Sequence, residues 1–358
     1  MSGDANTDDL LYMYDLNRAL HQPWYAISAL SYAILILLTF LGNALVIWTV
    51  VRRKYMWTAR NIFILNLAVS DIFLCFTMTI TAVDVLTKYW PFGSNTLFLC
   101  RAVKAFPCSA VYLSSITIVI IALDRYRFIV HSSAAQLSLN QSLIMLPFIA
   151  LISMLMGLPV FVHTHLHIPE MALENNGDNF WSHLVFCIED WTYGGSANTT
   201  VIQKENKRHF YSIFSLFFQY ILPFTIISVV YSLLYCYLKK HRMVRDDKQL
   251  ARERARRTNI MLAAISVLYC LCWLPLNFFN LLSDLYEGIF EGHTELMLSV
   301  FIGCHLIGMS SACINPFLYG YLNESFRKEF TDIFHALTCN KEAQLDNERN
   351  RRMSMVNA

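Results

Sequence analysis

The chain alternates between long apolar stretches and short polar segments. Seven apolar stretches are about 20 residues long or longer, the length at which a helix rising about 1.5 Å per residue crosses a hydrocarbon core of roughly 30 Å. They comprise residues 25–51, 62–83, 105–123, 139–162, 210–238, 258–282 and 296–322. The pattern predicts an all-α fold, an integral membrane bundle of seven transmembrane helices.

The composition agrees with a membrane protein. Of 358 residues, 56% are hydrophobic and 15% are charged, and the mean hydropathy is +0.41, which lies outside the range of an ordinary soluble domain. Asp71 is the one formally charged residue inside the seven stretches. A carboxylate at membrane depth is costly, so we expect Asp71 to be functional or paired. No nucleic-acid partner is predicted.

Basic residues predict the orientation. They gather after the first stretch, at Arg52, Arg53, Lys54 and Arg60, and again across residues 239–257. The positive-inside rule places these segments in the cytoplasm and the N-terminus outside, as in a multi-pass protein of the plasma membrane. The first 24 residues lack a basic segment followed by an apolar one, so no cleaved signal peptide is expected.

Four regions follow from this layout. Residues 1–24 form an extracellular tail, 25–322 the bundle, 323–338 an amphipathic helix on the inner membrane surface, and 339–358 a cytoplasmic tail. Cys339 is a palmitoylation site or an ordinary reduced thiol. The outer segments are acidic, which favours a cationic ligand, although acidic loops also serve solubility.

The ten cysteines are too scattered for a disulfide framework, and most lie in apolar stretches. Cys100 and Cys187 differ, because both are expected outside the membrane, where a bridge would tether the long outer loop to the third helix. Asn198 begins a glycosylation sequon in that loop. No metal-ligand spacing appears, and the alternating His163, His165 and His167 are interpreted as polar loop residues.

Polar residues inside the stretches predict an internal cluster. Ser114, Ser311 and Asn315 fall at a depth comparable with Asp71. Such a cluster could hold a sodium ion or form a structural hydrogen-bond network, and the residues favour neither.

Proline and charged residues mark the places where helices could move. Pro223 and Pro275 each remove a backbone hydrogen bond and are expected to kink their helices, and Trp273 places a large ring beside the second of these. The third stretch ends in Asp124-Arg125-Tyr126, either an interfacial ion pair or a latch that opens when a neighbouring helix moves. Packing alone could also explain the tryptophan.

Taken together in chain order, these features resemble the rhodopsin-like, class A G-protein-coupled receptors. The residues that carry the resemblance are Gly42-Asn43, Asn66 to Asp71, Cys100, Asp124-Arg125-Tyr126, Cys187, Pro223, Cys272-Trp273-Leu274-Pro275 and Asn315 to Tyr319. Further motifs in the chain resemble those of the neuropeptide Y receptor group and of its invertebrate relatives, the receptors for neuropeptide F and RFamide-type peptides. These are Trp90 to Gly93, Cys187 to Trp191, Gln219-Tyr220, Pro275 to Asn280 with Asp284, and Cys304 to Leu306.

The resemblance implies a receptor for an extracellular, amidated neuropeptide and no enzymatic activity. Asp284 would engage a ligand arginine, in a site lined also by Gln219, Asn277, Asn280, His305 and Glu189. A heterotrimeric G protein, by resemblance of the Gi/o class, would bind inside, with arrestin and a receptor kinase as further partners. The implied switch residues are Asp124, Arg125, Tyr126, Tyr231, Trp273, Pro275, Asn315, Pro316 and Tyr319. No cofactor is implied beyond the sodium ion.

Some residues depart from the pattern. Pro107 occupies a position of the third helix that is often polar, and Ile149 and Ala150 stand where a tryptophan is usual. Ser132 lies where a loop proline is usual, and Met309 lies where an opsin carries its retinal lysine, which excludes an opsin. Tachykinin-like or somatostatin-like ligands stay open, and an ion or proton transporter is disfavoured by the lack of an inverted repeat.

Overall fold

The structure is a computed structural model of the chain. It describes residues 17–130, 137–168, 184–191, 201–240, 249–286, 290, 292–336 and 338. Asn198 and Cys339 lie outside these residues, as do residues 1–16 and 339–358, so the predictions of a glycan, a palmitoyl group and two tails stay predictions.

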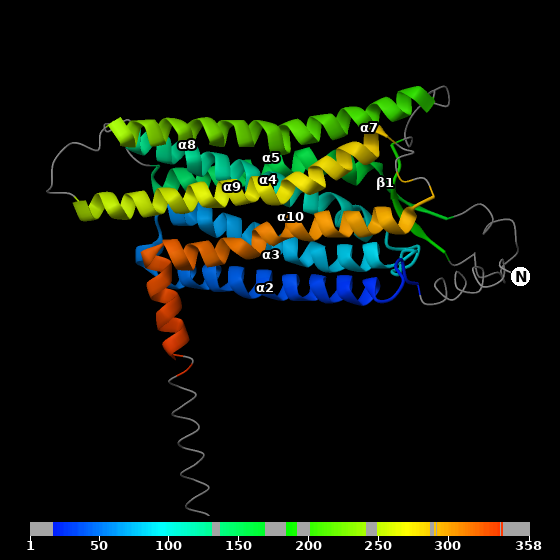
Figure 1. Cartoon of the computed structure of the whole chain (residues 1–358), viewed down its shortest axis with the longest axis horizontal. Helices are drawn as coiled ribbons and strands as arrows, with labels where there is room; N and C mark the ends of the chain where they lie inside the picture. Colours follow the sequence, from blue (N-terminus) through cyan, green and yellow to red (C-terminus); the bar gives the residue numbers. More distant parts are fainter. Residues whose placement is uncertain are drawn as a thin grey trace, which may run out of the picture.

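Long helices lie side by side, and successive ones run in opposite directions (Figure 1). Within the described residues, seven helices are long and apolar enough to cross a membrane, which confirms the predicted bundle. They are α2 (Trp24–Arg52), α3 (Ala59–Leu86), α4 (Leu97–Val130), α5 (Leu139–His163), a continuous helix made of α7 (Val201–Leu216), η3 (Phe217–Ile221) and α8 (Leu222–Lys240), α9 (Gln249–Leu285) and α10 (Thr294–Leu322). Each is longer than its apolar stretch, because the polar flanks continue the helices.

Among the described residues, two shorter helices lie at one end of the bundle. A 3-10 turn, η1 (Lys54–Met56), follows α2. Residues 324–336 are helical, and this segment turns away from α10 at a steep angle (Figure 1). Arg125 lies near the end of α4 on this side of the bundle. We therefore call this end of the bundle the Arg125 end, and we call the opposite end of the bundle the Cys100 end.

A disulfide joins Cys100 to Cys187 at the Cys100 end, as predicted. The sequence did not reveal that Cys187 belongs to a hairpin, in which β1 (Thr164–His167) pairs antiparallel with β2 (Phe186–Glu189). The alternation of His165, Leu166 and His167 was the available signal, since period-two alternation is typical of strands. The bridge therefore ties the hairpin to the first turns of α4.

The proline at position 223 produces a different irregularity from the predicted kink. Pro223 lacks the N–H that would bond back to residue 219, and the chain widens into the π-helical turn η3 (Phe217–Ile221) just before it. Gln219 and Tyr220 lie within this turn. Pro275 lies inside α9, and α9 bends along its length in Figure 1.

Apolar and polar side chains are distributed as expected for a protein surrounded by lipid. Large apolar side chains such as Phe76, Leu155 and Phe210 are exposed on the outside of the bundle. Inside it, Asn43 is fully buried and donates to the carbonyl oxygens of Thr39 and Ala312 at 2.9 and 3.0 Å. Interhelical polar contacts of this kind stabilise helix pairs in membranes.

Close packing between α2 and α10 depends on a glycine. A Cβ added at Gly42 would lie 2.9 Å from Cγ and 3.1 Å from Cβ of Pro316. A proline ring cannot swing aside, so only glycine lets the two helices approach this closely.

The substitution Gly42→Ala is therefore expected to lower the free energy of unfolding by about 1–3 kcal/mol through overpacking. Thermal unfolding of the purified protein in detergent measures this. Gly303→Ala is the matched control, because a Cβ there meets no atom within 4 Å, and helix propensity then favours alanine. Equal melting temperatures for the two variants would contradict the packing argument.

Candidate ligand-binding and coupling sites

Asp284 lies in the last turn of α9 at the Cys100 end, and it is already paired. Its Oδ1 accepts from Nη2 of Arg208 on α7 at 2.6 Å, and its Oδ2 accepts from the hydroxyl of Ser212, also on α7. The Asp284 side chain is 16% exposed, against 46% for Arg208. The predicted arginine-binding acid thus holds a guanidinium from its own chain.

A cavity of about 410 Å³ adjoins this ion pair between α7, α9 and α10, within the volume range of ligand pockets. Its walls are largely apolar, and the hydroxyl of Ser283 has no hydrogen-bond partner among the described residues. The lining residues are Arg208, Phe279, Ser283, Met297, Leu298 and Phe301.

His305 connects the cavity to the centre of the bundle. It is buried, its Nδ1 lies 2.8 Å from the hydroxyl of Tyr32 on α2, and its ring stacks on Phe301 with centroids 5.6 Å apart. The predicted ligand-binding histidine is therefore held in place from two sides.

The other predicted ligand residues are more dispersed. Gln219 contacts Ser215 and the carbonyl oxygen of Cys108 at 3.4 and 3.5 Å, and Asn277 donates to the carbonyl of Trp273 one turn earlier at 2.8 Å. Asn280 is exposed on α9, and Glu189 is exposed on β2. No contact in the described part of the chain joins Glu189 to Asp284, so their shared site stays a prediction.

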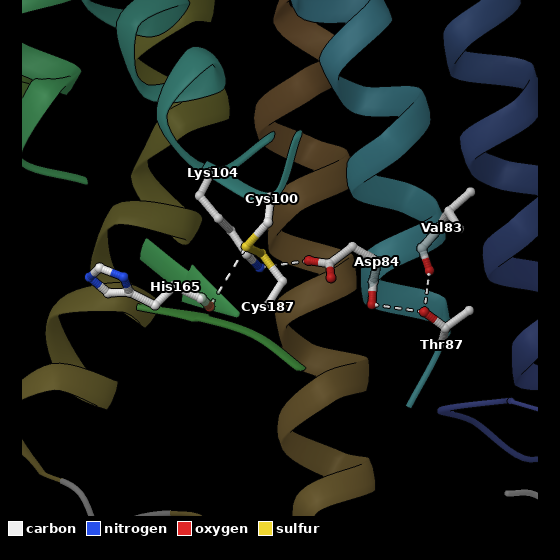
Figure 2. Close-up of polar contacts among 7 residues, drawn as sticks. All are labelled: Val83, Asp84, Thr87, Cys100, Lys104, His165 and Cys187. Atoms are coloured by element: carbon white, nitrogen blue, oxygen red, sulfur yellow. Dashed lines mark hydrogen bonds and ion pairs between the residues drawn. A yellow bond between two sulfur atoms is a disulfide. The ribbon is translucent and has the colours of Figure 1, made fainter. Parts of the chain in front are cut away.

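Sequence reasoning missed a second ion pair at this end. Nζ of Lys104 on α4 lies 2.6 Å from Oδ2 of Asp84 on α3. Figure 2 shows the Lys104 side chain beside the Cys100–Cys187 bridge, reaching toward Asp84. The sequence did hold a signal for this pair. Asp84 and Lys104 each flank an apolar stretch, and charged side chains at the ends of neighbouring membrane helices can pair.

Arg101 has a different partner from Lys104, although both lie on the same helix. Its guanidinium donates to the carbonyl of Thr164 at 2.9 Å and lies 3.3 Å from Nδ1 of His165. Burial, followed by the charge of Arg101, lowers the pKa of His165. This arginine therefore holds the hairpin.

The internal polar cluster forms only in part. Nδ2 of Asn315 donates to Oδ2 of Asp71 at 3.0 Å, whereas Ser114 contacts Ser70 at 3.2 Å. Ser311 accepts from Nε1 of Trp273 at 3.1 Å. The predicted members thus belong to three adjacent contacts, and the sodium site stays a prediction.

Trp273 packs closely on α10. Its ring lies 3.5 Å from the position of a Cβ on Gly308, and its centroid lies 6.1 Å from that of Tyr269. Pro275 follows it by two residues. A movement of the ring would therefore act on α9 and α10 together.

At the Arg125 end, Arg125 forms an ion pair with Asp124, and both are buried. Tyr231 on α8 has a buried hydroxyl without a hydrogen-bond partner in the part of the chain that the structure describes. Tyr319 is fully buried, and its hydroxyl has no partner within the described ranges. Tyr126 is half-buried. Of the predicted switch residues, Asp124 thus contacts Arg125 directly, whereas Trp273, Asn315 and Pro316 contact other residues. Their role as one switch stays a prediction.

Comparison with known proteins agrees with this arrangement. Residues 42–319 match the family described as 7 transmembrane receptor (rhodopsin family). The chain belongs to this family of receptors. Among its relatives are a Neuropeptide F receptor of Drosophila melanogaster, 39% identical over 88% of this chain, the human Neuropeptide Y receptor type 4-2, 31% identical over 91%, and the human Neuropeptide Y receptor type 2, 33% identical over 85%.

The shares of the relatives that the receptor covers differ. It spans 64% of the length of the Drosophila protein, and 83% and 75% of the two human proteins. The match to the rhodopsin family confirms the resemblance seen in the motifs. Together with the seven membrane-length helices, it shows a multi-pass membrane protein.

A second cluster at the Arg125 end attaches the helix of residues 324–336 to the connection between α2 and α3. Glu329, in the helix 324–336, is buried and accepts from Nε of Arg53 at 2.8 Å and from the hydroxyl of Tyr55 at 2.5 Å. Burial raises the pKa of Glu329, but the hydrogen bonds from Tyr55 and Arg53 outweigh it and hold the pKa below its ordinary value. The bond to Glu329, and then burial, raises the pKa of Tyr55 to about 12.

Glu329→Gln is expected to lower the melting temperature of the receptor at neutral pH, because charge-assisted bonds are stronger than neutral ones. The pKa of Glu329 is lower in the folded state than its ordinary value of 4.5. The stabilisation by its carboxylate is therefore fully present above pH 4.5 and is lost as the pH falls through the folded-state pKa. The difference from wild type should therefore close in acid. Thermal unfolding against pH measures it.

Asp332→Asn is the control, because Asp332 is exposed on the same helix. A difference for Glu329→Gln that is the same at all pH values, or that appears equally for Asp332→Asn, would contradict the assignment.

Proposed function

We propose that this receptor binds a basic, C-terminally amidated peptide of the neuropeptide Y, neuropeptide F or RFamide kind at the Cys100 end. In this proposal the Cys100 end faces the outside of the plasma membrane. A heterotrimeric G protein of the Gi/o class binds at the Arg125 end, and arrestin and a receptor kinase act there later.

The observation that carries the proposal is the partner of Asp284. Its carboxylate already binds a guanidinium, that of Arg208, at the edge of a cavity with apolar walls. Charge-assisted contacts of arginine with a carboxylate are strong and directional. A peptide arginine would take the place of Arg208, and a neighbouring aromatic or aliphatic side chain would enter the cavity.

The names of the relatives support a peptide as the ligand. The Drosophila and human proteins are called receptors for neuropeptide F and neuropeptide Y. Asp284, Gln219, Asn277, Asn280, His305 and Glu189 form the proposed ligand site.

Signalling in this proposal is a shift between two states of the bundle. A peptide that presses on the Trp273 layer favours an outward swing of α9. Arg125 then leaves Asp124, and Tyr231 and Tyr319 become its new neighbours. The opened face at the Arg125 end accepts the C-terminal helix of a G-protein α subunit.

Guanine-nucleotide exchange in membranes containing the receptor and Gi/o tests the coupling. Exchange that depends on a peptide ending in Arg-Phe-amide is the expected result. Ion flux without nucleotide exchange would contradict a receptor function.

Asp284→Asn is expected to weaken binding of that peptide by about 10-fold to 100-fold, because a charge-assisted bond is lost. Replacing the peptide arginine by citrulline should lower the affinity for the wild-type receptor by a similar factor. The same replacement should lower the affinity for the Asp284→Asn variant only slightly, because the contact is already lost there. Competition binding on membranes measures both.

Glu295→Gln is the matched control. Glu295 is an acid at the same end, in the first turn of α10, and it accepts from the backbone N–H of His21 at 2.9 Å. Equal losses for Asp284→Asn and Glu295→Gln would remove Asp284 as the arginine partner.

A further inference from the structure

Arg101 connects the hairpin of β1 and β2 to the first turns of α4. Its Nε donates to the carbonyl oxygen of Thr164 at 2.9 Å, and its Nη2 lies 3.3 Å from Nδ1 of His165. The guanidinium also lies over the ring of Phe161 on α5, at 5.8 Å from the ring centroid. Of these three neighbours of Arg101, His165 is the one whose charge changes near neutral pH.

The contact between Arg101 and His165 requires a neutral imidazole. A guanidinium has N–H donors and no acceptor, so Nδ1 of His165 must accept the hydrogen bond. A protonated imidazole carries a hydrogen on Nδ1, which turns the contact into one between two donors and two positive charges. Arg101 keeps its bond to Thr164 in either case. Protonation therefore drives the His165 ring away from Arg101.

The surroundings of His165 also favour the neutral form. Arg101 on α4 and His163 at the end of α5 oppose a positive charge there. Asp190, just after β2, favours one. Burial is the largest influence, and the sum of these effects places the pKa of His165 below its ordinary value of 6.5. His165 is therefore neutral near pH 7.4 and takes up a proton in acid.

His165 occupies a central place in a small hairpin. It pairs with Ile188, the neighbour of Cys187, and the hairpin has four residue pairs. The carbonyl oxygen of His165 lies 3.7 Å from Sγ of Cys100 (Figure 2). A two-stranded unit of this size is marginally stable by itself. Its position against α4 therefore depends on the disulfide and on side-chain contacts such as that of Arg101.

The end of the hairpin contacts residues of the proposed ligand site. Nε1 of Trp191, two residues beyond β2, donates to Oε2 of Glu189 at 3.4 Å. The Trp191 ring packs on that of Tyr211 in α7, with centroids 5.0 Å apart. The next residue, Ser212, donates to Asp284. A shift of the hairpin therefore acts on Glu189 and on the helix that holds Asp284.

We infer that the Arg101–His165 contact is an acid-sensitive element that holds the hairpin beside the ligand site at neutral pH and releases it in acid. A neutral His165 accepts from Arg101 and keeps β1 against α4. Protonation separates the two side chains, the hairpin shifts, and the affinity for the ligand falls. The effect on affinity rests on the proposed function, in which the Cys100 end faces the outside. A peptide bound at the cell surface is then released in an acidic compartment.

A first test needs no ligand. The melting temperature of the purified full-length receptor in detergent is measured from pH 7.4 to 5.5. Because the pKa of His165 is lower in the folded state than 6.5, its contribution to stability is complete above pH 6.5 and is lost as the pH falls below it.

His165→Asn is the informative variant in this test. The asparagine oxygen takes the place of Nδ1 as an acceptor and binds no proton. Wild type is expected to lose roughly 2 °C more than His165→Asn between pH 7.4 and 5.5. Equal losses for the two proteins would overturn the inference.

A second test measures the ligand affinity by competition binding on membranes. The probe is an N-acetylated peptide without histidine that ends in Arg-Phe-amide, so that the peptide itself does not titrate between pH 7.4 and 5.5. The affinity of wild type is expected to fall by about 5-fold or more across this interval, the lower end of ordinary coupling between two sites. His165→Asn should keep the wild-type affinity of pH 7.4 at both pH values.

A permanent charge should reproduce the acid state. His165→Lys places a positive charge beside Arg101 at every pH in the interval, so its affinity at pH 7.4 should equal that of wild type at pH 5.5. Surface labelling of intact cells corrects each value for the amount of folded receptor. A wild-type affinity for His165→Lys at pH 7.4 would contradict the inference.

His167→Asn and His163→Phe are the matched controls. His167 is exposed on the same strand, and the ring of His163 stacks on Trp191 with centroids 4.4 Å apart, a contact that phenylalanine preserves. Both variants should keep the pH dependence of wild type. A pH dependence that persists in His165→Asn, or that disappears equally in either control, overturns the inference.

The two tests separate the acid-sensitive contact from the proposed function. If the pH-dependent difference in melting temperature appears and the peptide does not bind, the contact is supported and the proposed ligand is wrong. If the peptide binds wild type with equal affinity at both pH values, the acid-sensitive contact is wrong and the proposed function stands.

Discussion

The interior of this bundle must satisfy its own polar groups, because the lipid around it offers no hydrogen bonds. Asn43 bonds to the backbone of α10, Asp71 to Asn315, and Trp273 to Ser311. Each of these contacts joins two helices. The polar groups that are costly in lipid are therefore the ones that determine how α2, α3, α9 and α10 lie against one another.

The same constraint produces charged pairs at both ends of the bundle. Asp284 holds Arg208, Asp84 holds Lys104, Asp124 holds Arg125, and Glu329 holds Arg53. In each of these four pairs an acid is matched by a base, so each pair is neutral as a whole. In the proposed function a ligand arginine would replace Arg208 at Asp284, and the difference between the two bonds would contribute to its affinity.

The switch residues follow the same logic. The ring of Trp273 rests on Gly308, beside Pro275 in a helix that bends. Tyr319 has a buried hydroxyl without a partner in the described part of the chain. A proline inside the helix beside a large ring, and a buried hydroxyl without a partner, are the features on which the proposed change between two packings depends.

The sequence by itself determined the seven spans, the disulfide between Cys100 and Cys187 and the motifs of the rhodopsin family, because these follow from hydropathy, local spacing and residue type. Only the tertiary structure decided that Asp284 is occupied by Arg208 and that Lys104 reaches Asp84. It also revealed the hairpin around Cys187 and the π-helical turn before Pro223. These features depend on which faces of helices far apart in the sequence pack together. A membrane helix is apolar both toward lipid and toward its neighbours, so the hydrophobic pattern does not specify those faces.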